Sequence, residues 1–228
     1  MTNILIYMKK FIVVYGGKIM KTIVNNWYNI SIGLAILFAA LALFTNGDAH
    51  QFYLLASAAV LCLHFFEEFG YPGGFPLMGI RIMIGSDEPD SNKWDCNNLS
   101  SMFGNWSALV LIYILPLIFP EVRFLTATTI ILSIAEVIMH LLLFNIKQKS
   151  IYNPGLGTGL LLGVIVAWYL FNGFDSSIYV LSDFVIGFIF FLIVFWFCYR
   201  SPWYWKLGRV KGYPLSKRSA YGLEMDKF

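Results

Sequence analysis

The sequence predicts an all-α protein: a polytopic transmembrane bundle of about six spanning helices, with an N-terminal amphipathic segment and a basic cytoplasmic tail. Composition is the first reason, because 58% of the residues are hydrophobic and only 13% are charged, against about 25% charged residues in soluble domains. The second is a series of six apolar segments, each near the roughly 20 residues that a helix needs to cross a bilayer. The third is that no polar linker divides them, so residues 29–199 are expected to form one bundle.

Residues 1–28 precede the first apolar segment and mix apolar side chains with Lys9, Lys10, Lys18 and Lys21. We expect an amphipathic segment that lies on a membrane surface, with its lysines toward anionic headgroups. No small-residue cleavage site follows a short apolar stretch, so a signal peptide is not predicted.

The six predicted spans cover residues 29–45, 51–69, 105–119, 123–146, 154–172 and 177–199. Turn formers or charges end them: Asn46-Gly47-Asp48 follows the first, and Pro120 follows the third. Pro154 suits the first turn of the fifth, where the N–H that it lacks would be unpaired anyway. Residues 70–104 are expected to be a polar loop, and residues 200–228 a basic tail.

The basic residues give an orientation. With six spans, fifteen of the 16 Lys and Arg residues fall on the side of the two termini, and only Arg123 falls opposite. Because positively charged loops stay in the cytoplasm, we expect an integral protein of the cell membrane with both termini cytoplasmic. The net charge of +3 is small, and no nucleic-acid partner is predicted.

Titratable side chains occur inside two of these apolar segments. His64 and Glu68 are four residues apart and share a helix face, with Glu67 beside them. Charged groups in lipid cost about 2.5–3.5 kcal/mol each, so a chain that keeps them usually uses them. Glu67 has a simpler alternative, in which it is only solvated at the headgroup level.

The fourth span carries Glu136 and His140, again four residues apart on one face. The second and fourth spans run in the same direction, so both pairs are expected at similar depth, where they can meet. Glu136 lies some ten residues from either end of its span, where an unpaired carboxylate is costly. For His140 alone, a packed neutral histidine is the alternative to a ligand.

Together these residues predict a metal site with His64, Glu68, Glu136 and His140 as ligands. Bundles build metal sites from inward-facing Glu and His in this way, and a nitrogen–oxygen donor set suits a divalent metal such as Zn, Fe or Mn. Glu67 and Glu68 are the predicted catalytic groups, and Glu67 would act as general base or bridge a second ion. The three cysteines are too far apart to suggest a thiolate zinc site.

Tyr152, Asn153 and Gly155 are predicted to bind substrate. They precede the fifth span at its cytoplasmic end, where a helix N-terminus offers free N–H groups and a positive dipole to an anionic group. Asn153 has the alternative of being an ordinary helix cap.

These motifs, in this order, resemble a known family. They are His64-x-x-Glu67-Glu68, then Pro72-Gly73-Gly74-Phe75, then Glu136-x-x-x-His140, then Tyr152-Asn153-Pro154-Gly155. The chain resembles the HXXEE family over roughly residues 50–175. The resemblance implies a small polytopic membrane protein whose His and Glu residues are catalytic or metal-binding, without naming a reaction.

The first functional hypothesis is therefore a metal-dependent membrane enzyme that acts at the cytosolic leaflet on an amphiphilic small molecule, a lipid or a hydrophobic peptide. Hydrolysis is favoured, and redox chemistry at non-haem iron would use similar ligands. One rival is a transporter or a cation- or proton-binding protein that uses the same residues. Another is a non-catalytic membrane partner that binds through the basic tail.

Overall fold

The structure is a computed structural model, and it describes residues 17–228. The described residues are helical and contain no strand, which confirms the predicted fold class. The predicted surface segment, residues 1–28, lies partly outside the described residues. Its described part is a helix, Gly17–Asn25, bent by 73° against α2 (Trp27–Ala42).

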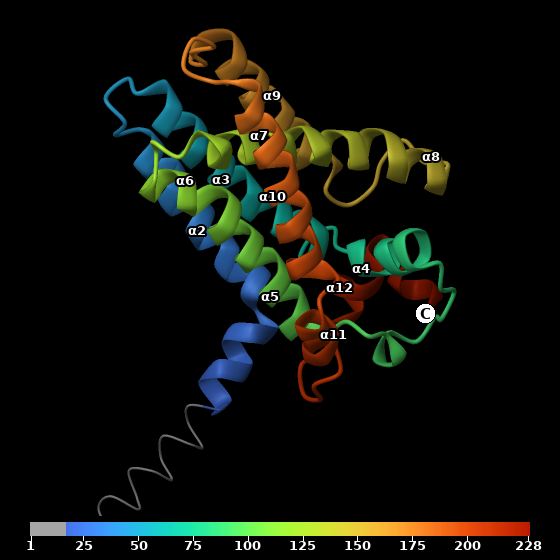
Figure 1. Cartoon of the computed structure of the whole chain (residues 1–228). Helices are drawn as coiled ribbons and strands as arrows, with labels where there is room; N and C mark the ends of the chain where they lie inside the picture. Colours follow the sequence, from blue (N-terminus) through green and yellow to red (C-terminus); the bar gives the residue numbers. More distant parts are fainter. Residues whose placement is uncertain (1–16) are drawn as a thin grey trace, which may run out of the picture.

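Each of the six apolar segments contains helix. After α2 they are α3 (Ala49–Phe69), α5 to α6 (Asn98–Ile118), α7 to α8 (Arg123–Gln148), α9 (Leu156–Asn172) and α10 (Leu181–Tyr199) (Figure 1). Four helices among the described residues are long and apolar enough to cross a membrane, or five if the bent pair with α2 is one span. The sixth, α9, is apolar but has only 17 residues. Six spans are therefore not confirmed.

Side-chain caps set several helix starts. Asp48 accepts a hydrogen bond from the backbone N–H of Gln51 at the start of α3. Asn97 and Ser100 form a capping box that begins the third segment at Asn98, seven residues before the predicted start at 105. The prediction of a loop up to residue 104 was wrong there, because a capping box satisfies N–H groups that would otherwise lack partners.

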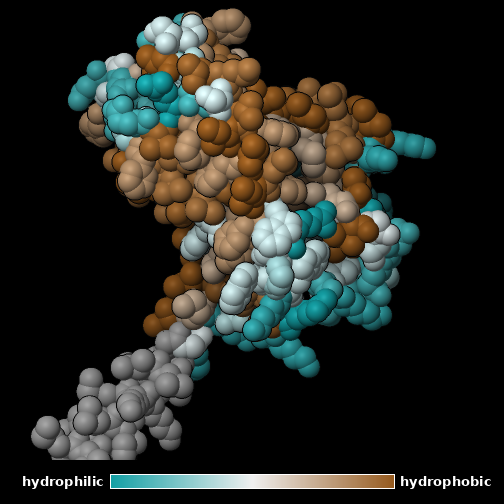
Figure 2. Space-filling view, in the orientation of Figure 1, coloured by the Kyte–Doolittle hydropathy of each residue, from teal (hydrophilic) through white to brown (hydrophobic). Residues whose placement is uncertain are grey.

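The core lies between the six apolar helices, with α3 packed against α2 and α9, and α7 against α9 and α10. Trp27 of α2 is fully buried and contacts Phe65 and Phe69 of α3. Hydrophobic residues also cover the outer surface, and hydrophilic residues gather at two ends (Figure 2). This distribution is compatible with a membrane protein.

The predicted loop and tail fold against each other. Residues 70–104 include α4 (Phe75–Gly79), the π-helix η1 (Ile80–Ile84) and the short η2 (Ser91–Lys93). The tail contains α11 (Pro202–Gly208), α12 (Lys217–Tyr221) and η5 (Gly222–Lys227). The N–H of Gly74 donates to the carbonyl of Ser219, and the Asn97 amide donates to three tail carbonyls. The tail thus closes the end of the bundle that carries α4 (Figure 1).

Candidate metal centre

Two helices bring two histidines and two glutamates together. His64 and Glu68 come from α3, while Glu136 comes from α7 and His140 from η4 (Ile138–Phe144). Each imidazole Nε2 lies 3.4 Å from a carboxylate oxygen on its own helix and 3.6 Å from one on the other helix. The two imidazole centroids are 4.9 Å apart at 90°. We call these four residues the His/Glu cluster.

The burial of the cluster is uneven. The side chains of His64, Glu68 and His140 are at most 4% exposed, whereas that of Glu136 is 22% exposed. The three buried residues each offer a ligand atom within 4.8 Å of the others, a grouping that could hold a metal ion.

His140 lies in a π-helical segment that follows the α-helical Glu136. Such segments are rare and occur frequently at functional sites. Sequence spacing predicted the shared face of Glu136 and His140 but gave no sign of this change of helix type.

The orientation of His140 is fixed by Asn153. The Asn153 amide nitrogen donates to the His140 carbonyl at 2.7 Å and to Oδ1 of Asn145 at 2.7 Å. The other amide atom, Oδ1, therefore faces Nδ1 of His140 at 2.6 Å, and an amide oxygen can only accept. His140 must carry its proton on Nδ1, which leaves the lone pair of Nε2 directed at the cluster.

His64 is held in the same tautomer by a relay. Oγ1 of Thr158 lies 2.5 Å from Oε2 of Glu67, to which its single proton is donated. Oγ1 must then accept the hydrogen bond from Nδ1 of His64 at 2.8 Å. Nε2 of His64 is left with a free lone pair, as metal-binding histidines require.

The cluster therefore joins two lone-pair nitrogens to two carboxylates. When both imidazoles are neutral and both carboxylates are ionised, none of the four groups has a hydrogen to donate to another. Their lone pairs then repel one another unless a cation lies among them. A tetrahedral zinc ion with ligands at about 2.0–2.2 Å places neighbouring ligand atoms about 3.3–3.6 Å apart. The four imidazole–carboxylate separations, 3.4 and 3.6 Å, are close to that spacing, and His64, Glu68 and His140 are the three residues whose ligand atoms all lie within 4.8 Å of one another.

Glu67 faces away from the cluster. Its carboxylate accepts from the backbone N–H groups of Gly157 and Thr158, from the Thr158 hydroxyl and from the Tyr152 phenol. These four bonds use the roughly four lone-pair positions of a carboxylate. The assignment of Glu67 as a base or as a ligand to a second ion stays a prediction, and this geometry favours a supporting role.

Tyr152, Asn153 and Gly155 were predicted to bind substrate, and all three contact residues of the site. Tyr152 donates to Glu67 at 2.9 Å, and burial together with the Glu67 charge raises the pKa of its phenol, so it stays a donor. Gly155 has φ of +98°, and a Cβ there would lie 2.8 Å from Cε1 of His64 and even closer to Cε1 of His140. Their role in substrate binding stays a prediction.

A cavity of about 450 Å³ opens beside the cluster and is bordered by all four of its residues. Most of its other walls are apolar, from α3, η1, α7 and α10, and Arg200 lines it after the end of α10. Sequence reasoning missed this cavity and the role of Thr158. The only available signal for Thr158 was the glycine-rich start of α9, where Gly157 permits the close approach of Glu67.

One family model matches the chain over residues 55–170, and its description is "Protein of unknown function with HXXEE motif". The match covers just over half of the 228 residues, so the chain belongs to this family. No curated protein and no solved structure matches.

Proposed function

We propose that this HXXEE-family chain is a membrane-embedded, metal-dependent enzyme that acts at the cytosolic leaflet on an amphiphilic substrate. The observation that carries the proposal is the pair of Nε2 lone pairs, which Asn153 and Thr158 direct at two carboxylates on the wall of an apolar cavity. Supporting groups that fix the tautomer in this way are typical of metal-ligating histidines.

Charge favours a divalent ion. Two ionised carboxylates give the cluster a charge of −2 in a site with little access to water, and burying uncompensated charge is expensive. One divalent cation would neutralise both. Zn, Fe and Mn all accept imidazole and carboxylate ligands, and the proposal covers all three.

We assign His64, Glu68 and His140 as the ligands, because these three are buried. Two histidines and one glutamate form the ligand set of several zinc hydrolases, and two histidines and one carboxylate that of non-haem iron oxygenases. A bound ion would supply Lewis acidity to a carbonyl or phosphoryl oxygen.

Glu136 is the fourth ligand or the proton acceptor. The Glu136 side chain is partly exposed and lines the cavity. Its carboxylate can therefore accept a proton from a water molecule in the cavity. Hydrolysis is accordingly the favoured reaction, and iron redox chemistry the second. Glu68, predicted to be both ligand and catalytic group, is proposed here as a ligand.

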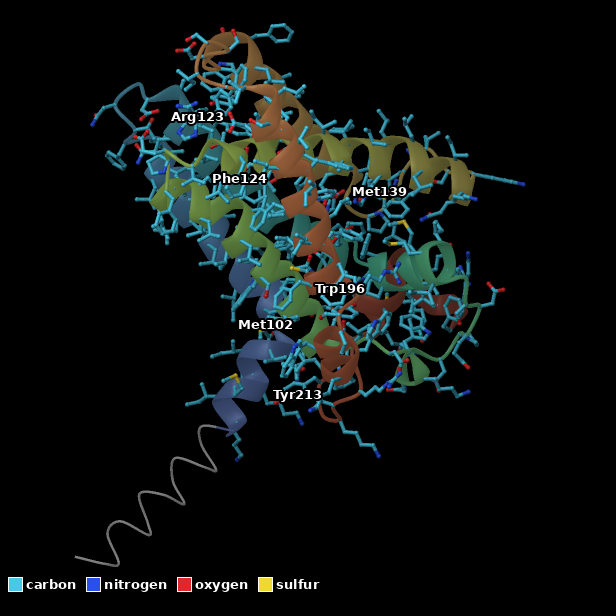
Figure 3. The ribbon with its side chains drawn as sticks, viewed as in Figure 1. Met102, Arg123, Phe124, Met139, Trp196 and Tyr213 are labelled. Carbon is cyan, nitrogen blue, oxygen red and sulfur yellow. The ribbon has the colours of Figure 1, made fainter. Side chains whose placement is uncertain are left out.

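The cytosolic location rests on the basic residues. The end of α3 that carries the cluster leads into residues 70–104, which pack against the basic tail. Positive charge at this end favours the cytoplasmic side. Arg123, at the start of α7, and Tyr213, in the tail, lie at opposite ends of the molecule (Figure 3).

Metal analysis tests the proposal. The full chain, purified in detergent, should carry about one divalent ion, which His64→Ala and His140→Ala should each lose. His50→Ala is the matched control, because His50 is the one other histidine of the chain and forms a hydrogen bond with Thr126, outside the cluster. A folded wild-type protein that takes up no Zn, Fe or Mn would refute the enzyme proposal and favour a proton- or cation-carrying role.

A further inference from the structure

The cavity beside the His/Glu cluster reaches the apolar outer surface. Ile84 of η1, Ile138 of η4 and Leu192 of α10 all line it, and each is also 44–51% exposed. Figure 3 shows Met139, another lining residue, on the side of its helix toward α4. Since these outer surfaces are hydrophobic (Figure 2), a molecule could enter the cavity from the lipid rather than from water.

A cation lies on the wall of the same cavity. Arg200 follows α10 directly, and its guanidinium makes one long hydrogen bond, at 3.4 Å, to the carbonyl of Met83. Within residues 17–228 no carboxylate pairs with it, and residues 1–16 contain no Asp or Glu. Arg200 is therefore free to bind an anion, for which its planar guanidinium is well suited.

These two features lie along one helix. Leu192 and Arg200 are eight residues apart, a rise of about 12 Å in an α-helix. The apolar opening and the Arg200 guanidinium thus border the cavity at different positions along the helix axis. An amphiphile could place its apolar chain at the first and its headgroup at the second. The volume of about 450 Å³ lies in the lower half of the ~300–1,000 Å³ range for small-molecule sites and suits one chain better than two.

We propose that the cavity binds a single-chain amphiphile with an anionic headgroup, a carboxylate or a phosphate, which enters from the bilayer between η1, η4 and α10 and is oriented by Arg200. This inference rests on the proposed function, because it names the substrate class of the same site. It adds a recognition residue outside the His/Glu cluster and an entry route.

Equilibrium binding to the full chain in lipid nanodiscs tests this inference, with empty nanodiscs as the blank. The probes are hexadecanoate, hexadecyl phosphate, neutral hexadecanol and cationic hexadecyltrimethylammonium. Both anionic probes should bind more tightly than the other two, and the tighter of the two anions identifies the headgroup. Arg200→Gln should weaken both anions about tenfold and leave hexadecanol unchanged.

Two further variants serve as references. Arg200→Lys keeps the positive charge and should retain most of the preference for anions. Arg209→Gln removes an exposed arginine that is already paired with Asp95 and should change nothing. Two results would overturn the inference. One is an equal loss of binding for the anionic and the neutral probes in Arg200→Gln, and the other is tighter binding of hexadecanol or hexadecyltrimethylammonium than of either anion.

Metal content, measured on the same samples, separates the two proposals. A metal-free protein that binds anions through Arg200 refutes the metal-dependent enzyme and upholds the amphiphile site. A metal-loaded protein that binds all four probes equally well upholds the metal site and refutes the anionic-amphiphile site.

Discussion

Histidines lie at both ends of the region where α3 packs against α9 and against α7 with its continuation η4, with different results. At the end near the start of α3, His50 makes one hydrogen bond, to Thr126 at 2.9 Å, and lies beside the Tyr169 ring. At the other end, each histidine has two carboxylate neighbours and a partner that fixes its tautomer.

The difference shows what turns a histidine at a helix interface into a candidate ligand. His50 satisfies its hydrogen bonding with a neutral hydroxyl, as a packed histidine does. His64 and His140 direct lone pairs at negative charge, an arrangement that is favourable only with a cation or an added proton. Helical spacing to a glutamate separates the two cases within the sequence, because His50 has no acidic residue three or four positions before or after it.

The largest expected effect on metal affinity comes from Gly155→Ala, beside the His/Glu cluster. Gly47→Ala is the matched substitution at the His50 end of the interface. Both glycines have positive φ, but a Cβ at Gly155 would collide with both imidazoles, and one at Gly47 would meet nothing within 4 Å. Each substitution should cost about 1–2 kcal/mol in backbone strain. Only Gly155→Ala should also weaken metal affinity, by about 100-fold or more, as measured by competition with a chelator.

If the two variants lost metal equally, the close packing of Gly155 against the imidazoles would have no part in the site. Thermal unfolding of both proteins provides the control. A similar drop in unfolding temperature shows that both variants carry similar backbone strain, so a difference in metal affinity comes from the contact with the imidazoles.

The next largest effect compares the two carboxylates of the cluster. Glu68→Gln should reduce metal affinity at least about tenfold more than Glu136→Gln, because Glu68 belongs to the buried ligand set whereas Glu136 is partly exposed. Isothermal titration with zinc measures both. The reverse ranking would make Glu136 the principal ligand and remove the proposed proton acceptor.

A smaller loss is expected from the groups that orient the histidines. Asn153→Ala and Thr158→Val should each weaken metal binding about 10–100-fold, because each removes the acceptor for an imidazole Nδ1–H. Thr158→Ser keeps the hydroxyl and should bind metal nearly as well as the wild type. Metal binding by Thr158→Val that equals that of Thr158→Ser would exclude the relay from Glu67.

The smallest effect belongs to the other end of the interface. Thr126→Val removes the hydrogen bond to His50 and should lower the free energy of unfolding by about 1 kcal/mol, without a change in metal content. Chemical denaturation and elemental analysis of one preparation give both quantities. Loss of metal in this variant would mean that the two ends are coupled, contrary to the comparison.

Much of this architecture could be predicted from local patterns. Apolar runs identified the six helices, and i, i+4 spacing put His64 with Glu68 and Glu136 with His140. The start of α5 was missed because Asn97 and Ser100 cap it among polar residues. The role of Thr158 was missed because it depends on a contact with Glu67, 91 residues away in sequence. Contacts of this kind are determined by packing and leave no periodic signal.

X-ray absorption spectroscopy of the zinc-loaded full chain tests the central claim most directly. The account predicts two imidazole nitrogens at about 2.0–2.1 Å together with carboxylate oxygen, in the wild-type protein and in His50→Ala alike. A spectrum with sulfur ligands, or with no more than one imidazole in the wild-type protein, would contradict the account.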